Sequence, residues 1–357
     1  MMEIKADEME GGGQVLRSSV SLSSVLGIPV RLFNIRAKRA KPGMQAQHLM
    51  GVEAAAKITS AEVQGLVKGS MELAYTPKTI NGGKFSFNIG TAGSSMLVLQ
   101  TLLPIVLFSP SEVQLRIIGG THVAWSPNFH FVKEVFLPIV GKMGCSLEYF
   151  ELERAGWYPK GEGAVKLLVK PINFLKPLQL TSPGKFIKIL GVSCCSNLPE
   201  TIPQRQASAA RKLLIKNNYD AEIKELVLPS RSKGSALTLW AVYENTILGA
   251  SSLGELGKKS EEVGEEAARK LLEEMGSGAA LDSHMGDQVL IYMALAKGES
   301  SITVSKLTSH MKTNIWVIEQ FTNQRFRIEE LEGGMARVAV TGIGFERAQR
   351  SLEQNWK

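Results

Sequence analysis

The sequence predicts an α/β (α+β) protein whose large domain is built from three repeated units and is interrupted by a smaller inserted domain. Helix-type and strand-type patterns alternate along the 357 residues, which is typical of mixed folds. The order helix, strand, helix and paired strands occurs three times, and such self-similarity indicates an internal repeat. The stretch 183–276 departs from this order and is bracketed by Pro and Gly residues, which indicates an insertion.

The first unit opens with a helix over residues 14–26, which Gly27 ends because glycine readily takes the left-handed conformation there. An apolar strand follows over 28–35. A second helix begins after Pro42, a residue that suits a first helical turn, and extends to about residue 58. Alternating apolar and polar residues then predict strands at 62–67, 72–75 and 85–89.

The second and third units repeat this order. The second is predicted to contain helices at 94–107 and 129–143, with strands at 113–118, 147–153 and 164–169. The third is predicted to contain helices at 284–296 and 314–321, a strand at 302–307, and a hairpin through Gly333-Gly334 that extends to residue 340.

The inserted stretch has its own strand and helix patterns. Its beginning is marked by Pro177, Pro183 and Gly184, and its end by Gly276-Ser277-Gly278. We expect a large domain of residues 1–182 and 277–357 and a small domain of residues 183–276. Inside the small domain the patterns predict strands at 186–192, 222–228, 237–243 and 246–250, and helices at 205–215 and 261–275.

Composition narrows the class of protein. With 44% apolar and 21% charged residues, the chain is typical of a globular protein, and no stretch approaches the ~18 apolar residues that span a bilayer. The N-terminus has no signal-peptide pattern. Three cysteines (Cys145, Cys194, Cys195) make a poor disulfide framework and favour a reducing cytoplasm. The absence of CxxC and HExxH motifs argues against structural zinc, and a net charge of +7 modestly favours a polyanionic partner.

Two N-terminal segments could bind anions. Glu10 and three glycines precede the first helix, where backbone amides can face an anion and the carboxylate can ligate a hard cation or favour the helix dipole. Residues 36–41 hold four cations, among them Arg36 and Arg39, so this segment is a solvated basic loop or a phosphate clamp. His48 follows one turn into the next helix. No Walker A motif is present.

Polar residues also interrupt two apolar helices. Gln100 lies in a nearly all-apolar helix, where an unpaired amide costs about 1–3 kcal/mol, so it needs a structural or a ligand partner. Pro104 cannot donate to the carbonyl of Gln100, which predicts a local opening of that helix. Asp282 or Ser283 can cap the helix whose first turn places His284, Asp287 and Gln288 on one face, as in a nucleotide site or a polar surface turn.

His310 completes the candidates. It lies in a predicted loop before a helix for which Thr313 is the expected cap. An imidazole with a pKa near 6.5 is largely neutral at pH 7 and can act as a nucleophile, although most loop histidines do not.

Taken in order, these segments resemble the RNA 3′-terminal phosphate cyclase family over nearly the whole chain. The matching motifs are EGGGQVLRS (10–18), RAKRAKPG (36–43) with His48, GSSMLVLQT (93–101), GGT (119–121), GEG (161–163), HMGDQ (284–288) and His310. The family fold, with three related α/β units and a small inserted domain, agrees with the predicted order.

The resemblance implies an ATP-dependent reaction in three steps. His310 would attack the α-phosphate of ATP and release pyrophosphate, AMP would pass to an RNA 3′-phosphate, and the neighbouring 2′-hydroxyl would close a 2′,3′-cyclic phosphate and expel AMP. Glu10 would ligate Mg²⁺ or Mn²⁺, and the expected partners are ATP, RNA with a 3′-phosphate, no membrane, and a homodimer as an open option. The implied phosphate-binding residues are Arg17, Arg36, Arg39 and His48, and the implied adenylate contacts are Gln100, His284, Met285, Gly286, Asp287 and Gln288.

Two alternatives accompany this hypothesis. Nuclear relatives act in ribosome assembly without catalysis and lack the nucleophilic histidine, so the presence of His310 argues against that role. A sugar-phosphate transferase of related architecture would not need an adenylated histidine. The chain departs from the family pattern at His122 and His130, where many relatives carry an acidic residue.

Overall fold

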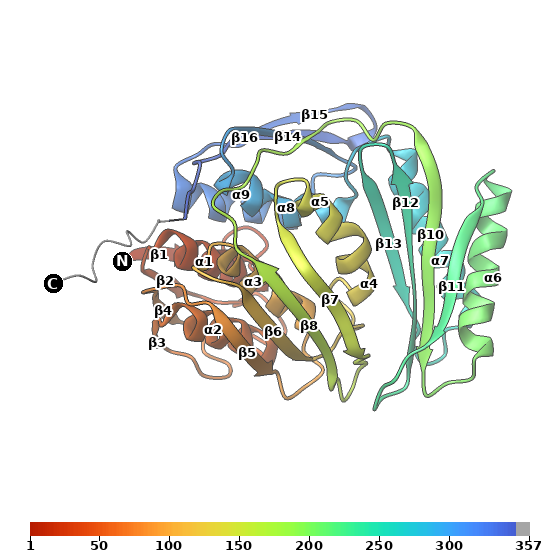
Figure 1. Cartoon of the computed structure of the whole chain (residues 1–357), viewed down its shortest axis with the longest axis horizontal. Helices are drawn as coiled ribbons and strands as arrows, with labels where there is room; N and C mark the ends of the chain where they lie inside the picture. Colours follow the sequence, from red (N-terminus) through yellow and green to blue (C-terminus); the bar gives the residue numbers. More distant parts are fainter. Residues whose placement is uncertain (348–357) are drawn as a thin grey trace.

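The computed structural model describes residues 1–347 and contains three four-stranded sheets that share one topology (Figure 1). In each sheet the first two strands along the chain are parallel and the last two are antiparallel, which gives the spatial order first, second, fourth, third. A parallel pair needs a crossover connection, and each time a helix lies in it. The predicted fold class is therefore confirmed.

The first unit carries two helices and a sheet of order β1-β2-β4-β3. Its elements are β1 (Met2–Lys5), α1 (Gly13–Leu26), β2 (Val30–Phe33), α2 (Ala46–Thr59), β3 (Glu62–Gln64) and β4 (Leu73–Thr76). The second unit has the order β5-β6-β8-β7. Its elements are β5 (Gly83–Asn88), α3 (Ser95–Val106), β6 (Val113–Gly119), α4 (Phe129–Phe131), η1 (Val132–Phe136), α5 (Leu137–Gly141), β7 (Ser146–Arg154) and β8 (Gly163–Lys170).

The third unit is divided by the insertion, which lies in its parallel crossover between β9 and α8. The sheet order is β9-β14-β16-β15. Its elements are β9 (Gln179–Leu180), α8 (Ser283–Leu295), β14 (Glu299–Val304), α9 (Ser309–Thr322), β15 (Arg327–Glu330), the short 3₁₀ turn η2 (Glu332–Gly334) and β16 (Ala336–Thr341).

The inserted segment forms a sheet of order β11-β10-β12-β13, and its helices α6 and α7 contact each other and this sheet (Figure 1). Leu214 of α6 and Leu271 of α7 are fully buried in a cluster of their own against Leu237 and Leu239. The elements are β10 (Phe186–Ser196), α6 (Thr201–Lys216), β11 (Ala221–Val227), β12 (Gly234–Tyr243), β13 (Ile247–Leu253) and α7 (Ser260–Gly276).

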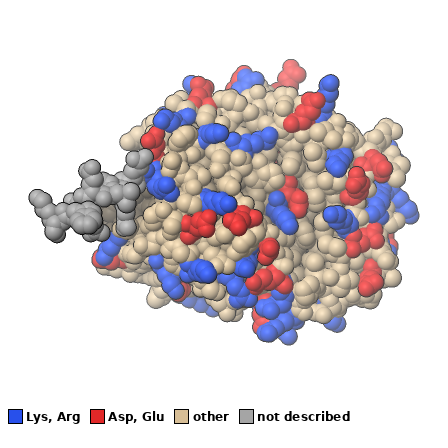
Figure 2. All heavy atoms as spheres, in the orientation of Figure 1, with Lys and Arg blue, Asp and Glu red and all other residues tan. Residues whose placement is uncertain are grey.

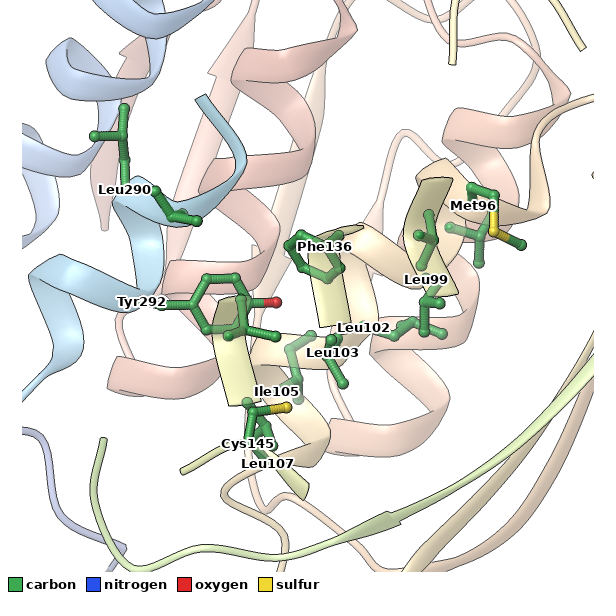
Figure 3. Close-up of a cluster of buried hydrophobic side chains, with 14 of the residues drawn as sticks. Met96, Leu99, Leu102, Leu103, Ile105, Leu107, Phe136, Cys145, Leu290 and Tyr292 are labelled. Carbon is green, nitrogen blue, oxygen red and sulfur yellow. The ribbon is translucent and has the colours of Figure 1, made fainter. Parts of the chain in front are cut away.

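Helices from all three units meet in the middle of the large body, where α1 contacts α2, α3 and α9, and α8 contacts α3 and α9. Figure 3 shows part of this contact, with the apolar face of α3 packed toward Phe136 and toward Leu290 and Tyr292 of α8. The rings of Phe136 and Tyr292 lie 6.0 Å apart in an edge-to-face arrangement, a favourable geometry for aromatic pairs. This buried helical layer fixes the N-termini of α1, α8 and α9 relative to one another.

The structure corrects several predicted elements. The sequence patterns missed β1 and β9, because four and two residues are too short to show a period of two. The predicted strand at 85–89 corresponds to β5, and the prediction placed it in the first unit. Because β5 pairs in parallel with β6, it belongs to the sheet of the second unit.

The predicted helix at 129–143 is broken into α4, η1 and α5, of which η1 is a π-helical turn. Pro138 lacks an N–H and cannot bond the carbonyl four residues earlier, which favours a wider turn there. The opening predicted at Gln100 was wrong, because α3 continues through Pro104. Among residues 1–347, no helix combines the length and the apolar character needed to cross a membrane.

The start of α2 also differs from the prediction. Helix α2 begins at Ala46 and not directly after Pro42, because Gln45 and His48 form its capping box. Gly43 lies between Pro42 and the start of α2. It has φ +69°, and a Cβ there would lie 2.1 Å from the carbonyl oxygen of Gly69. A left-handed residue so close to another backbone segment must be glycine.

Candidate active site

The glycine run places two basic side chains against the start of α1. Gly12 is the N-cap residue and Gly13 the first helical residue. A Cβ on Gly13 would lie 2.3 Å from Nε2 of His48, and one on Gly12 would lie 2.9 Å from Nη2 of Arg39. Because the first amides of a helix have no intrahelical partners, this junction is suited to bind an anion such as phosphate.

His48 is buried and acts as a neutral hydrogen-bond donor. Its Nδ1 accepts a hydrogen bond of 3.1 Å from the backbone N–H of Gln45. Burial, together with the nearby cations Arg17 and Arg36, lowers the pKa of His48 to about 3. The proton therefore sits on Nε2, the nitrogen that faces the start of α1.

Arg17, on the second turn of α1, points into the space between the helices. It donates to the side-chain oxygen of Gln14, while its Nε is buried without a hydrogen-bond partner. Burial lowers the pKa of Arg17 to about 10, although Asp287 and Glu10 oppose this shift. Since a buried N–H without a partner is costly, the free donor indicates a place for a ligand oxygen.

His310 and Glu10 meet at the mouth of this space. Nδ1 of His310 lies 2.7 Å from Oε2 of Glu10, and the other carboxylate oxygen contacts Arg39. Burial lowers the pKa of His310; Glu10 raises it, and Arg17 and Arg39 lower it further. With Nδ1 facing the carboxylate, Nε2 is the nitrogen left for a substrate, and a neutral ring carries the lone pair that a nucleophile needs.

His310 does not lie in a loop, as we predicted from the sequence. Thr308 is the N-cap of α9, and its hydroxyl accepts from the N–H of Met311, so His310 belongs to the first turn of the helix. The expected cap, Thr313, instead donates to the carbonyl oxygen of Ser309 and accepts from the backbone N–H of Glu10 at 3.4 Å. Thr313 thus links the Glu10 segment to α9.

The first turn of α8 forms the opposite wall. Asp282 caps the helix, accepting from the N–H groups of His284 and Met285 at 3.0 and 2.8 Å. Burial raises the pKa of Asp287 to about 7, a shift that Arg17 opposes. His284 is exposed, whereas Met285 and Gly286 are buried, and a Cβ on Gly286 would lie 2.8 Å from the side chain of Val304.

Gln100 has a specific partner across the repeat boundary. Its amide donates to the side-chain oxygen of Gln288 at 2.6 Å, and Gln288 donates in turn to the carbonyl of His284 at 2.8 Å. The amide of Gln100, the polar side chain in the otherwise apolar α3, therefore has its hydrogen-bond partner on α8. This pair connects the second unit to the turn at 284–288.

The sequence analysis missed Asn314. Its side-chain oxygen accepts from Gln14 at 2.8 Å and Ser18 at 2.7 Å, and its amide donates to the carbonyl of Asp287 at 2.9 Å. It lies beside a cavity of about 30 Å³ whose lining also includes Arg17 and Gln100. Asn314 is four residues from His310 on α9, a spacing that would have revealed it had the helix start been placed correctly.

The guanidinium of Arg36 is used within its own loop. Its guanidinium donates to the carbonyl oxygens of Lys41 and Gly43 at 2.6 and 2.7 Å, which holds the basic loop in shape. On the face of the molecule drawn in Figure 2, Lys and Arg alternate with Asp and Glu, so the net charge is not gathered in one patch there. The local cluster around α1 is therefore more informative than the total charge.

A repeated α/β fold with a histidine–carboxylate pair, three phosphate-type donors and a helix N-terminus at one place defines an enzyme that handles phosphate groups. A model of the family described as RNA 3′-terminal phosphate cyclase matches residues 8–328. The chain belongs to that family.

Curated relatives agree over almost their whole length. The chain is 45% identical over 340 residues to the RNA 3′-terminal phosphate cyclase of Pyrobaculum aerophilum, covering 95% of the chain and 97% of the relative. It is 44% identical to those of Archaeoglobus fulgidus, covering 92% and 98%, and of Methanosarcina barkeri, covering 93% and 98%. The predicted enzyme class is thereby confirmed, and the non-catalytic alternative is not favoured.

Proposed function

We propose that this enzyme uses ATP to convert an RNA 3′-terminal phosphate into a 2′,3′-cyclic phosphate through an AMP adduct on His310. The observation that carries the proposal is the contact between Nδ1 of His310 and Glu10 beside Arg17, Arg39 and His48 at the start of α1. A bare phosphate monoester is a poor electrophile, and adenylation gives it a good leaving group.

In the first step, Nε2 of His310 forms a bond to the α-phosphorus of ATP, and the bond from that phosphorus to the bridging oxygen breaks, releasing pyrophosphate. The ring becomes more positive as the P–N bond forms. Glu10, at 2.7 Å from Nδ1, is placed to stabilise that charge. Arg17, with its free Nε, and His48, with its Nε2 proton, are placed to donate to phosphate oxygens.

In the second step, an oxygen of the RNA 3′-phosphate attacks the same phosphorus, and the P–N bond breaks to regenerate His310. In the third, the terminal 2′-hydroxyl loses its proton and attacks the 3′-phosphate, and AMP leaves. We assign Gln100 and Gln288, which line one cavity between α3 and α8, to the adenylate, together with the adjacent backbone at Met285 and Gly286.

The residues present fit a divalent metal only in part. Oε2 of Glu10 is buried beside Nδ1 of His310, and a carboxylate oxygen is a ligand that a hard cation accepts. No second carboxylate lies against it among the cluster described above, so we propose that Glu10 supplies one ligand and that phosphate oxygens supply others. Bound there, Mg²⁺ or Mn²⁺ would neutralise charge on the phosphates.

The remaining expectations stay proposals. We retain residues 1–182 with 277–357 as the catalytic domain and 183–276 as an inserted domain. A cytoplasmic location and a homodimer also remain predictions.

The proposal is tested by incubating the purified protein with ATP labelled at the α-phosphate or at the γ-phosphate. Label from the α-position should remain on the protein after denaturation, and label from the γ-position should not. The bond should be labile in acid and stable in base, as expected of a phosphoramidate. Transfer of γ-label, or no label from either position, would overturn the proposal.

Substitutions at Arg39 and Lys38 distinguish a specific phosphate clamp from a diffuse basic surface. We expect Arg39→Ala to reduce cyclisation about 10-fold or more, because a hydrogen bond to a charged group contributes about 1.5–3 kcal/mol. Arg39→Lys should recover little, since lysine lacks the planar fork. The measurement is the initial rate of cyclic phosphate formation.

Lys38→Ala is the matched control, because Lys38 is exposed one position away and makes no contact with Glu10 in the described structure. It should retain nearly full activity. Equal and small losses at both positions that moderate salt erases would instead indicate a diffuse basic surface.

Glu10→Gln should raise the Mg²⁺ or Mn²⁺ concentration needed for half-maximal adenylation, because an amide is a poorer ligand for a hard cation. The measurement is a metal titration of AMP–protein formation. Glu8→Gln, in the same loop but exposed and paired with Lys5, should leave the titration unchanged. An unchanged titration in the Glu10 variant would assign Glu10 to positioning His310 alone.

A further inference from the structure

A second cluster of ligand-type side chains lies away from the candidate active site. His122, His130 and Cys194 are all buried, and one potential ligand atom from each lies within 4.8 Å of the other two. His122 follows β6, His130 is in α4, and Cys194 is in β10 of the inserted segment. The cluster therefore joins the second unit to the inserted sheet.

The two imidazoles already face each other at a spacing close to that of metal ligands. Nε2 of His122 and Nδ1 of His130 are 3.1 Å apart. On a tetrahedral zinc, with Zn–N distances of about 2.0–2.1 Å, two nitrogens lie roughly 3.3 Å apart. The sulfur of Cys194 lies within 4.8 Å of a ring nitrogen of each histidine, and a thiolate ligand lies about 2.3 Å from zinc.

His122 also has the partner that a metal-bound histidine usually has. Its Nδ1 lies 2.8 Å from the hydroxyl oxygen of Thr121, which also accepts the N–H of Gly156 at 2.9 Å. Metal-ligating histidines commonly donate their second N–H to an oxygen, which orients the ring. Thr121 would thus fix the tautomer that leaves the Nε2 lone pair of His122 for the metal.

The neighbouring contacts hold the two sides of the cluster rigidly. Asn128 and Thr238 hydrogen-bond through their side chains at 2.9 and 3.2 Å, and the indole N–H of Trp157 donates to Ser196 at 2.9 Å. Each pair joins the second unit to the inserted sheet. Ligands supplied by such braced elements are held in place before a metal binds.

We propose that His122, His130 and Cys194 bind one Zn²⁺ ion that fastens the inserted segment to the second unit. Two imidazoles and a thiolate are ligands that zinc accepts, and the fourth tetrahedral position has no protein ligand within the cluster. Because the three side chains are between 0 and 6% exposed, the site serves stability and not catalysis. It uses none of the residues proposed for the cyclase reaction.

The proton balance of binding is defined. Before binding, the 3.1 Å contact requires a proton on one of the two facing nitrogens, and Cys194 is a buried free thiol. On binding, the N–H of His122 is at Nδ1, that of His130 is at Nε2, and the thiol proton leaves to solvent. Each zinc bound therefore releases one proton.

The test is a titration of the chelator-treated full-length protein with Co²⁺, which replaces zinc and reports its ligands by absorption. We expect about one equivalent to produce a thiolate-to-cobalt charge-transfer band together with visible bands of a tetrahedral ion, and Zn²⁺ to displace it. A metal at Glu10 could not give this band, because none of the residues around Glu10 described above is a cysteine.

Cys194→Ser should abolish the band, whereas Cys195→Ser should keep it. Cys195 is the adjacent residue of β10, and its sulfur faces the carbonyl of Leu198 at 3.6 Å. Thr121→Val should retain the band but weaken Zn²⁺ binding about 10- to 100-fold. Absence of the band in the unmodified protein, or its persistence in Cys194→Ser, would overturn the proposal.

The change in Tm on addition of Zn²⁺ is a second measurement, which also shows whether each variant is folded. Zn²⁺ should raise the Tm of the unmodified protein and of Cys195→Ser, because a ligand that binds only the folded state stabilises it. It should not raise the Tm of Cys194→Ser. An equal rise in both cysteine variants would place zinc elsewhere and contradict the proposal.

Discussion

His310→Ala should lose covalent attachment of AMP completely while keeping the fold. The substitution removes the imidazole that lies against Glu10 and that would form the P–N bond. The side chain is 53% exposed, and alanine is a favourable residue in the first turn of α9, so little packing is lost. The measurement is retention of α-label on the denatured protein, together with a melting curve.

Lys312→Ala is the matched control, since Lys312 is exposed in the same helical turn. It should be labelled as strongly as the unmodified protein. If His310→Ala still carries an acid-labile adduct, the nucleophile is another histidine, and His284 or His48 would be the next candidates by position. That outcome would contradict the assignment of the nucleophile and leave the family membership unchanged.

A 3′-phosphorylated strand that ends in a 2′-deoxynucleotide should be adenylated but not cyclised. The first two steps need only ATP, the enzyme and the 3′-phosphate, and this strand supplies the phosphate. The third step lacks its attacking hydroxyl. An AMP-capped strand should therefore accumulate, which mass spectrometry detects as a gain of one adenylate.

A ribonucleotide end of the same sequence should give the cyclic phosphate and free AMP instead. The pair of strands separates the enzyme from both sequence-based alternatives, because a non-catalytic assembly protein would change neither strand and a sugar-phosphate transferase would ignore both. A deoxy strand that is never adenylated, beside a ribo strand that is cyclised, would show that the 2′-hydroxyl acts earlier. The order of the three steps would then be wrong.

Much of the fold could be predicted because its elements carry local signals. Helix α1 ends at Gly27, which has φ +67°, as expected, and α8 is capped by Asp282, one of the two caps that the sequence allowed. The long strands of the second unit and the insertion also have clear alternating patterns. Short strands and the beginning of α9 were missed or misplaced, since too few residues define them.

The candidate site was predictable as a set of residues but not as a geometry. The resemblance of motifs indicated Glu10 and His310 as site residues. Their contact joins segments that are far apart in the sequence, and no sequence pattern predicts it. Arg36 and Arg39 looked equivalent in a basic run, but in the structure Arg39 contacts Glu10 and Arg36 closes its own loop. Hydrogen-bond partners, and not charge, distinguish them.

By itself, then, the sequence determined the order of the longer helices and strands, the threefold repeat and the family, because neighbouring residues set periodicity, capping and motifs. Only the tertiary structure decided that β5 belongs to the second sheet and that His122, His130 and Cys194 meet. The absence of CxxC and HExxH motifs had argued against structural zinc. The three side chains of the cluster come from separate elements, so no local motif indicates them. Strand pairing and burial arise from contacts between distant segments, and no short window of sequence contains them.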